Sequence, residues 1–130
     1  MKKYVLDTSA LIAYLEAEEG FNRVEEILNL EDVIMPFVTL LELYYVSLQE
    51  QGQSVADHRY ATFRRFNILW QFDEQTTLTA AHLKANNHIS FADSMIAAVA
   101  IQNNAILVHK DPEYEQLMGQ LEMEALPYKT

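Results

Sequence analysis

The chain has 130 residues, of which half are hydrophobic, and a formal net charge of -10. This composition fits one folded domain over residues 1–130 and excludes an intrinsically disordered chain. The absence of cysteine excludes a disulfide framework and any cysteine-ligated zinc or iron–sulfur site. The excess of acids argues against a general nucleic-acid coat protein, because phosphate contacts require Lys and Arg. We expect a soluble, cytoplasmic protein, because no apolar run is long enough to cross a membrane.

Strand and helix signals alternate along the first half of the chain. Residues 4–6 are a short apolar run that predicts a buried strand, and the capping residue types at Asp7 and Ser9 follow it. Apolar residues at helical spacing then predict a helix over about residues 9–18, closed by Gly20. The next expected elements are a helix over 22–30, a strand over 32–36, a helix over 39–51, a helix from about 54 to 67, and a strand over 68–72.

The second half continues the same alternation. Its expected elements are a helix over 76–83 capped by Thr76 or Thr77, a very apolar helix from Ser90, a strand over 105–108, a helix start at Asp111-Pro112, and an edge strand over 123–126. Alternating strands and helices predict an α/β fold with a mostly parallel central sheet of four to five strands, covered by helices on both faces.

Four acids stand at the starts of expected helices: Asp7, Glu42, Asp93 and Asp111. The carboxyl ends of parallel strands meet at one edge of a sheet, which is where ligands bind in such folds. Each acid also has a simpler explanation, as a cap that stabilises its own helix by about 1 kcal/mol. Residues 39–42, for example, form a capping-box pattern.

The surroundings of Asp93 favour a shared site over four separate caps. Apolar residues three, four, seven and eight positions further on share its helical face, so Asp93 is expected to point into the core. An unpaired charge there is costly, and Lys and Arg are scarce near all four acids. A divalent cation would supply the missing counter-charge, and Mg²⁺ prefers oxygen ligands. A metal that activates water suits the hydrolysis of a phosphodiester.

These segments resemble the PIN-domain family, and within it the VapC-type toxins of prokaryotic toxin–antitoxin pairs. Residues 5–12, 39–42, 90–98 and 106–111 look like the four motifs of that family in their order, and the resemblance covers nearly the whole chain. It implies a PIN-like three-layer α/β/α sandwich. It also implies an endoribonuclease dependent on Mg²⁺ or Mn²⁺.

The resemblance further implies roles for particular residues and partners. The metal ligands and catalytic acids would be Asp7, Glu42, Asp93 and Asp111, with the Ser9 hydroxyl beside the first acid. The implied partners are an RNA substrate, a cognate antitoxin with a basic tail and a second copy of the chain in a homodimer, with no membrane. The chain departs from the family by having His109 where Thr is common. A further acid usually follows this region, and Glu113 is its near equivalent.

Two other functions compete with the nuclease. A PIN-like fold can serve as a binding module without turnover, although the presence of all four acids argues against this. A receiver-like domain that accepts phosphate would need an Asp at the end of a middle strand, and Phe72-Asp73 does not provide a clear site.

The remaining conspicuous residues are given structural interpretations. Those expected at the surface or in loops are His58, His82, His88 and, next to the predicted site, His109. Those expected on a solvated helix face are Arg59, Arg64 and Arg65, and those expected in the core or in a subunit contact are Tyr44, Tyr45 and Trp70.

Overall fold

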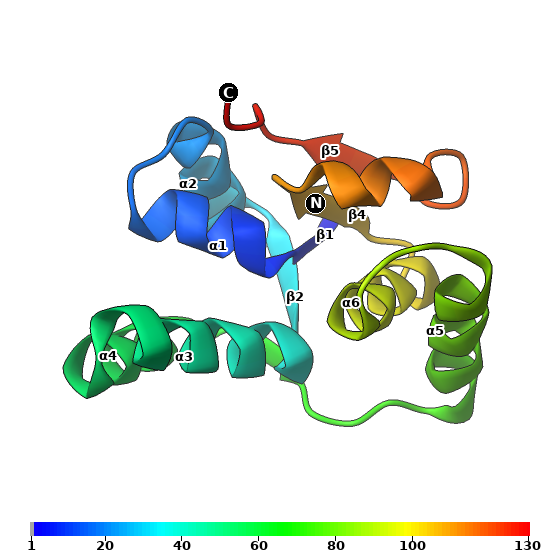
Figure 1. The fold of residues 1–130 in the computed structure, drawn as a ribbon, viewed down its shortest axis with the longest axis horizontal. Helices are drawn as coiled ribbons and strands as arrows, with labels where there is room; N and C mark the ends of the chain where they lie inside the picture. Colours follow the sequence, from blue (N-terminus) through cyan, green and yellow to red (C-terminus); the bar gives the residue numbers. More distant parts are fainter. Residues whose placement is uncertain (1) are drawn as a thin grey trace.

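A computed structural model describes residues 2–130 and contains a parallel sheet of five strands in the order β3-β2-β1-β4-β5. The strands are β1 (Lys3–Leu6), β2 (Asp32–Pro36), β3 (Asn67–Leu69), β4 (Ile106–His109) and β5 (Met123–Ala125). Because β1 lies between β2 and β4, the first strand of the chain occupies the centre of the sheet (Figure 1). The predicted α/β class with a parallel central sheet is confirmed.

Helices cover both faces of this sheet. They are α1 (Thr8–Leu15), α2 (Phe21–Leu30), α3 (Phe37–Gln51), α4 (Gln53–Arg64), α5 (Glu74–Asn86), α6 (Phe91–Gln102) and the 3₁₀ helix η1 (Pro112–Leu117). Successive residues of a strand point to opposite faces. Tyr4 and Leu6 accordingly belong to a core with α1, α2 and α4, whereas Val5 belongs to a second core with α5, α6 and η1. Residues of α3 contribute to both cores.

The first helices begin and end differently from the prediction. The helix expected over 9–18 ends at Leu15, and Gly20 precedes α2 as its N-cap rather than closing α1. Gly20 has a φ of +102°, and a Cβ atom there would meet the Leu126 side chain at 3.1 Å. The glycine therefore permits both the turn and close packing against the C-terminal segment.

The capping box predicted over residues 39–42 is wrong. The helix α3 begins two residues earlier, with Pro36 at its N-cap position, and the Thr39 hydroxyl donates to the Leu6 carbonyl oxygen at 3.4 Å instead. Thr39 and Glu42 thus lie inside the helix. Their side chains are free to reach β1 and the segment that follows it.

Other boundaries shift by a few residues. The strand expected over 68–72 is shorter and ends at Leu69. The helix α5 begins at Glu74, because the Asp73 carboxylate accepts the Thr76 N–H at 2.8 Å and so caps it earlier than predicted. The helix start at Asp111-Pro112 is confirmed, as the 3₁₀ helix η1, and β5 is indeed an edge strand. Within residues 2–130, no helix combines the length and apolarity needed to span a bilayer.

Candidate functional site

Asp7 and Asp111 reach the same edge of the sheet from neighbouring strands. Asp7 directly follows β1 and caps α1, since its Oδ2 accepts the Ser9 N–H at 3.0 Å. Asp111 follows β4 and caps η1, since its Oδ1 accepts the Glu113 N–H at 2.9 Å. Because β1 and β4 are paired and parallel, both helix starts lie at the carboxyl edge. Asp7 and Asp111 therefore each cap a helix and also lie at the same edge of the sheet.

Helices α3 and α6 bring two further acids to this edge. Glu42 lies in the second turn of α3, and Asp93 lies in the first turn of α6, where its N–H donates to the Ser90 hydroxyl at 3.1 Å. One oxygen from each of Asp7, Glu42 and Asp93 lies within 4.8 Å of the others. The structure thus brings together three of the four predicted acids in one cluster.

The fourth predicted acid belongs to an adjoining cluster. Oxygens of Asp93, Asp111 and Glu113 also lie within 4.8 Å of one another. Asp93 is common to both groups, so the five acids form one continuous acidic site. In the sequence, Glu113 was the near equivalent of the further acid that usually follows the fourth motif of the family. It reaches the cluster with Asp93 because η1 begins immediately after Asp111.

Neutral donors hold the Asp7 carboxylate in place. The Ser9 hydroxyl donates to Oδ2 at 2.5 Å, and the Tyr114 hydroxyl donates to Oδ1 at 2.7 Å. The Ser9 oxygen in turn accepts the Lys110 N–H at 2.9 Å, which links α1 to the end of β4. Asp7 is buried, with 3% of its surface exposed. Its orientation is therefore fixed from both sides without any counter-charge.

Glu42 is held in a similar way. The Thr8 hydroxyl donates to Glu42 Oε1 at 2.5 Å across α1 and α3. Partial burial raises the pKa of the Glu42 carboxyl, and the negative charge of Asp7 raises it further, while the hydrogen bond from Thr8 acts in the opposite direction. Burial has the largest effect on the Glu42 pKa and outweighs the hydrogen bond from Thr8.

Among the acids of the site, Asp93 has the largest shift in pKa. Burial, followed by hydrogen bonding with Glu113 and repulsion from Asp7, raises the pKa of Asp93 to about 9. The same hydrogen bond lowers the pKa of Glu113, which is more exposed. Without a cation, Asp93 therefore keeps its proton at neutral pH, and Glu113 accepts a hydrogen bond from it.

The interpretation of His109 as a surface or loop residue is wrong. His109 is the last residue of β4 and is 1% exposed, because its ring packs 4.9 Å from the Tyr114 ring and 6.2 Å from the Tyr128 ring. Burial lowers the pKa of His109, so the ring is neutral at pH 7. Its Nδ1 accepts the Asp111 N–H at 3.2 Å and thereby shapes the turn that carries Asp111. The other histidines are exposed as expected: His58, His82 and His88.

Two contacts of the site could not be read from the sequence. Thr8 could be recognised only as a capping residue type, and Tyr114 was not singled out at all. The contacts of their hydroxyls join residues 34 and 107 positions apart, whereas sequence patterns report neighbours within a helical turn or a strand. The only available signal for Tyr114 was its position three residues after Asp111.

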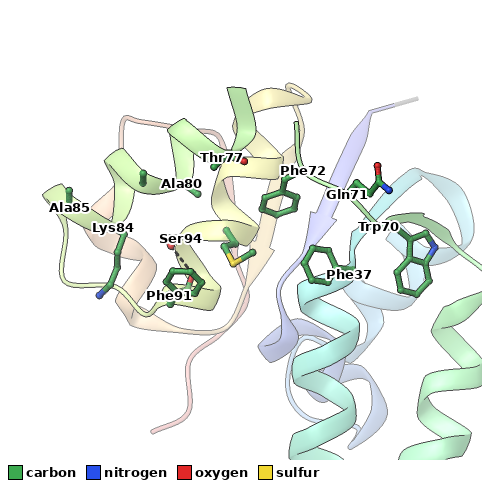
Figure 2. A pocket seen from close by; sticks show the side chains of 12 residues that line it. Phe37, Trp70, Gln71, Phe72, Thr77, Ala80, Lys84, Ala85, Phe91 and Ser94 are labelled. Carbon is green, nitrogen blue, oxygen red and sulfur yellow. Dashed lines mark hydrogen bonds between the residues drawn. The ribbon is translucent and has the colours of Figure 1, made fainter. Parts of the chain in front are cut away.

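An apolar recess of about 880 Å³ lies between the start of α3, the segment after β3, and helices α5 and α6. Figure 2 shows Phe37 and Phe72 facing this space, with Phe91 at its rim. Phe91 precedes Asp93 by two residues and is 70% exposed, and Trp70 is 49% exposed. The core interpretation of Trp70 is therefore wrong, as it is for Tyr45, which is 44% exposed.

Of the three arginines expected on a solvated helix face, Arg64 and Arg65 are exposed, whereas Arg59 is largely covered by contacts within the chain. Arg59 pairs with Glu16 at 3.4 Å and also donates to the Ser47 hydroxyl, so it connects α4 with α1 and α3. Arg64 lies 5.2 Å from the centre of the Trp70 ring. Arg65 is exposed and donates to the Thr62 carbonyl oxygen.

Comparison with solved structures supports the fold. A chain of the VapBC2 complex of Rickettsia felis bound to a promoter DNA fragment is 20% identical, with a TM-score of 0.78 over 96% of this chain and 99% of that chain. A chain of DNA-bound VapBC from Salmonella typhimurium is 23% identical, with a TM-score of 0.78 over 96% and 98% of the two chains. VapC20 of Mycobacterium tuberculosis, described as a toxin that cleaves the sarcin–ricin loop, is 15% identical, with a TM-score of 0.76 over 95% and 99%.

A comparison with curated protein sequences gave no match. The family model described as "PIN domain" matches residues 4–119, a range that contains all five acids of the site as well as Ser9 and Tyr114. This chain therefore belongs to the PIN-domain family.

Proposed function

We propose that this protein is a metal-dependent endoribonuclease that acts in the cytoplasm as the toxin of a VapBC-type toxin–antitoxin pair. The observation that carries the proposal is the convergence of Asp7, Glu42 and Asp93, whose oxygens lie within 4.8 Å of one another. Membership of the PIN-domain family supports a nuclease. The structural similarity to chains of VapBC complexes and to the RNA-cleaving toxin VapC20 supports the toxin assignment.

The residues of the site fit a divalent cation such as Mg²⁺ or Mn²⁺. Asp7 and Asp93 are buried, and no ion pair within residues 2–130 joins Asp7, Glu42 or Asp93 to a Lys or Arg. Buried carboxylates require a counter-charge or a proton, and Asp93 holds a proton at neutral pH in the metal-free chain. An all-oxygen donor set is the one that Mg²⁺ and Mn²⁺ prefer.

The chain's own side chains would position this chemistry. Asp7, Glu42 and Asp93 would hold the cation, with Asp111 at the adjoining end of the site. A divalent ion supplies activation of water and neutralises charge on the phosphate. Ser9 and Thr8 keep Asp7 and Glu42 in fixed orientations through hydroxyl donors. Such preorganisation lets the acids receive a cation without rearrangement.

The same geometry suggests how an antitoxin would silence the protein. No ion pair within the described residues occupies Asp7, Glu42 or Asp93, so an Arg or Lys from another chain would find these carboxylates already oriented. Arg is favoured, because its planar guanidinium binds carboxylates with two parallel hydrogen bonds. We propose that an antitoxin with a basic tail inserts such a residue between Asp7, Glu42 and Asp93. The VapBC complexes among the similar structures support a partner of this kind.

We also propose that a second copy of the chain covers the apolar recess to form a homodimer. Phe91 and Trp70 expose large apolar surfaces at this recess, and Leu78 on α5 is 50% exposed. Burial of such surfaces is favourable by about 25 cal/mol per Å². A dimer formed here would bring the α6 start of each chain, which carries Asp93, near the interface, because Phe91 lies two residues from Asp93.

The deciding experiment compares the wild type with Asp7→Asn in two assays. Asn keeps the size and capping ability of Asp7 but removes the charge that binds the cation. We expect the purified wild type to cleave single-stranded RNA only with Mg²⁺ or Mn²⁺, and the variant to be inactive. We also expect expression of the wild type, but not of the variant, to arrest bacterial growth.

A matched control tests whether the loss of any acid has the same effect. Glu25 is exposed on α2 outside the acidic site, so Glu25→Gln changes the net charge equally and should retain cleavage and growth arrest. Equal growth of the wild-type and Asp7→Asn strains, together with no divalent-dependent cleavage of RNA, would refute the toxin nuclease and favour a binding module without turnover.

A further inference from the structure

Tyr114 touches the acidic site although nothing in the chemistry described so far requires it. Its ring is completely buried in η1, and its hydroxyl donates to Asp7 Oδ1 at 2.7 Å. The same hydroxyl also interacts with the Asp93 carboxyl. Tyr114 therefore interacts with two of the three acids that converge on the site. A phenylalanine would fill nearly the same volume, so the hydroxyl requires a separate explanation.

Every group that orients Asp7 is an uncharged donor. Oδ2 accepts the backbone N–H and the hydroxyl of Ser9, and Oδ1 accepts the hydroxyl of Tyr114. These donors occupy two hydrogen-bonding positions on Oδ2 and one on Oδ1, so a lone pair of Oδ1 remains available. They fix the carboxylate without neutralising it. A Lys or Arg in place of Tyr114 would fix it too, but would compete with a cation.

The position of the Tyr114 hydroxyl is itself rigidly determined. The ring packs against His109, 4.9 Å between ring centres, and His109 is held by the Asp111 N–H. Asp111 in turn caps η1 through the Glu113 N–H. The turn that places Asp111 and Glu113 near Asp93 thus also places the Tyr114 hydroxyl next to Asp7. One short helix therefore carries both Glu113 and the hydroxyl that binds Asp7.

We propose that Tyr114 is a positioning residue of the metal site: its hydroxyl holds Asp7 Oδ1 in an orientation that accepts a divalent cation. This inference rests on the proposed function, because it concerns the cation of that site. Tyr114 would influence metal binding through the orientation of Asp7, without touching the ion itself. Partners that orient metal ligands in this way typically change metal affinity by about 10–100-fold when they are removed.

The test measures Mn²⁺ binding to the full chain by isothermal titration after removal of metal, for the wild type and Tyr114→Phe. We expect the dissociation constant of the variant to rise at least about tenfold. The melting temperature of the metal-free protein should change little, because the ring remains. At saturating Mn²⁺, RNA cleavage should largely recover. A residue that only supports the fold would not shift the Mn²⁺ concentration needed for half-maximal activity.

Tyr128→Phe is the matched control, since Tyr128 also packs against His109 but has no hydrogen bond to the acids. It should bind Mn²⁺ like the wild type. Equal Mn²⁺ affinity of the wild type and Tyr114→Phe would overturn the role of Tyr114 and leave the proposed function intact. A Tyr114→Phe variant that cannot fold would also overturn it, because the hydroxyl would then serve the fold. A wild type that binds no Mn²⁺ would instead refute the proposed function itself.

Discussion

At the scale of a single residue, the proton on Asp93 couples the stability of the metal-free protein to pH. The pKa of Asp93 is about 9 in the folded chain and 3.8 in the absence of its surroundings. Between these values the folded state binds one more proton than the unfolded state. Stability is therefore greatest at low pH, as far as this group is concerned, and falls as the pH rises toward 9. His109, whose pKa is lowered, acts in the opposite direction but only below pH 6.5.

We therefore expect the metal-free wild type to lose stability between pH 7 and pH 8.5, by at most about 1.4 kcal/mol per pH unit. Urea unfolding in EDTA at several pH values measures this slope. Asp93→Asn has no titrating group at that position and should show a flat profile, and Mn²⁺ should flatten the profile of the wild type. A slope that persists unchanged in Asp93→Asn would assign the effect to other groups.

Residue-level prediction from the sequence succeeded where a periodic pattern was available. The helical face shared with apolar residues indicated that Asp93 is buried, and the structure places it there with 6% exposure. His109 and Tyr114 have no such pattern. Their burial depends on packing between β4, η1 and the C-terminal segment, which only the completed fold brings together.

At the scale of secondary-structure elements, the start of α6 links helix stability to the site. The Ser90 hydroxyl accepts the Asp93 N–H at 3.1 Å, so the cap and a proposed metal ligand share one turn. Ser90→Ala should destabilise the protein by about 1 kcal/mol and also weaken Mn²⁺ binding, because the first turn of α6 would fray. Thermal unfolding and Mn²⁺ titration of the same samples measure both effects.

Helix α5 offers the control for this prediction, since the Asp73 carboxylate caps it through the Thr76 N–H. Asp73→Ala should cost about the same stability but leave Mn²⁺ affinity unchanged, because α5 carries none of the acids. Ser90→Thr should restore most of both properties. If Ser90→Ala and Asp73→Ala weakened Mn²⁺ binding equally, the effect would reflect general destabilisation.

The order and type of the elements could be predicted, whereas several boundaries could not. Strand and helix periodicities differ clearly, so the alternation was visible in the sequence. The start of α3 was not, because the favourable pattern at Thr39 competes with a tertiary contact: the Thr39 hydroxyl bonds to the Leu6 carbonyl of β1. Local capping preference is worth about 1 kcal/mol and yields to packing of a whole helix.

At the scale of the whole molecule, a cation should act as a ligand of the folded state only. Repulsion among the acids is relieved when the ion binds, and the unfolded chain has no such cluster. Mn²⁺ at about a hundred times its dissociation constant should raise the free energy of unfolding by about 2.7 kcal/mol. Differential scanning calorimetry with and without Mn²⁺ tests this. Asp7→Asn should abolish most of the gain, and an equal gain in that variant would show binding elsewhere.

The proposed dimer is tested at the same scale with a charge in the apolar recess. Ala81 on α5 is exposed and lines the recess, so Ala81→Glu should produce a monomer where light scattering finds the wild type to be a dimer. His82→Glu adds the same charge at the neighbouring exposed position, outside the lining, and should remain a dimer. A monomeric wild type at micromolar concentration would exclude this assembly.

The central place of β1 has a consequence for synthesis of the chain. Asp7 leaves the ribosome early in synthesis. The strand that precedes it, β1, pairs with β4, and the Asp7 carboxylate accepts a hydrogen bond from Tyr114, 107 positions later in the chain. At about 5–20 residues per second, β1 waits roughly 5–20 s for β4 to emerge. Pairing of such distant segments is also slow to nucleate. A growing chain therefore carries an incomplete acidic site until translation is nearly finished, and the proposed nuclease would lack its complete site throughout the elongation of its own chain.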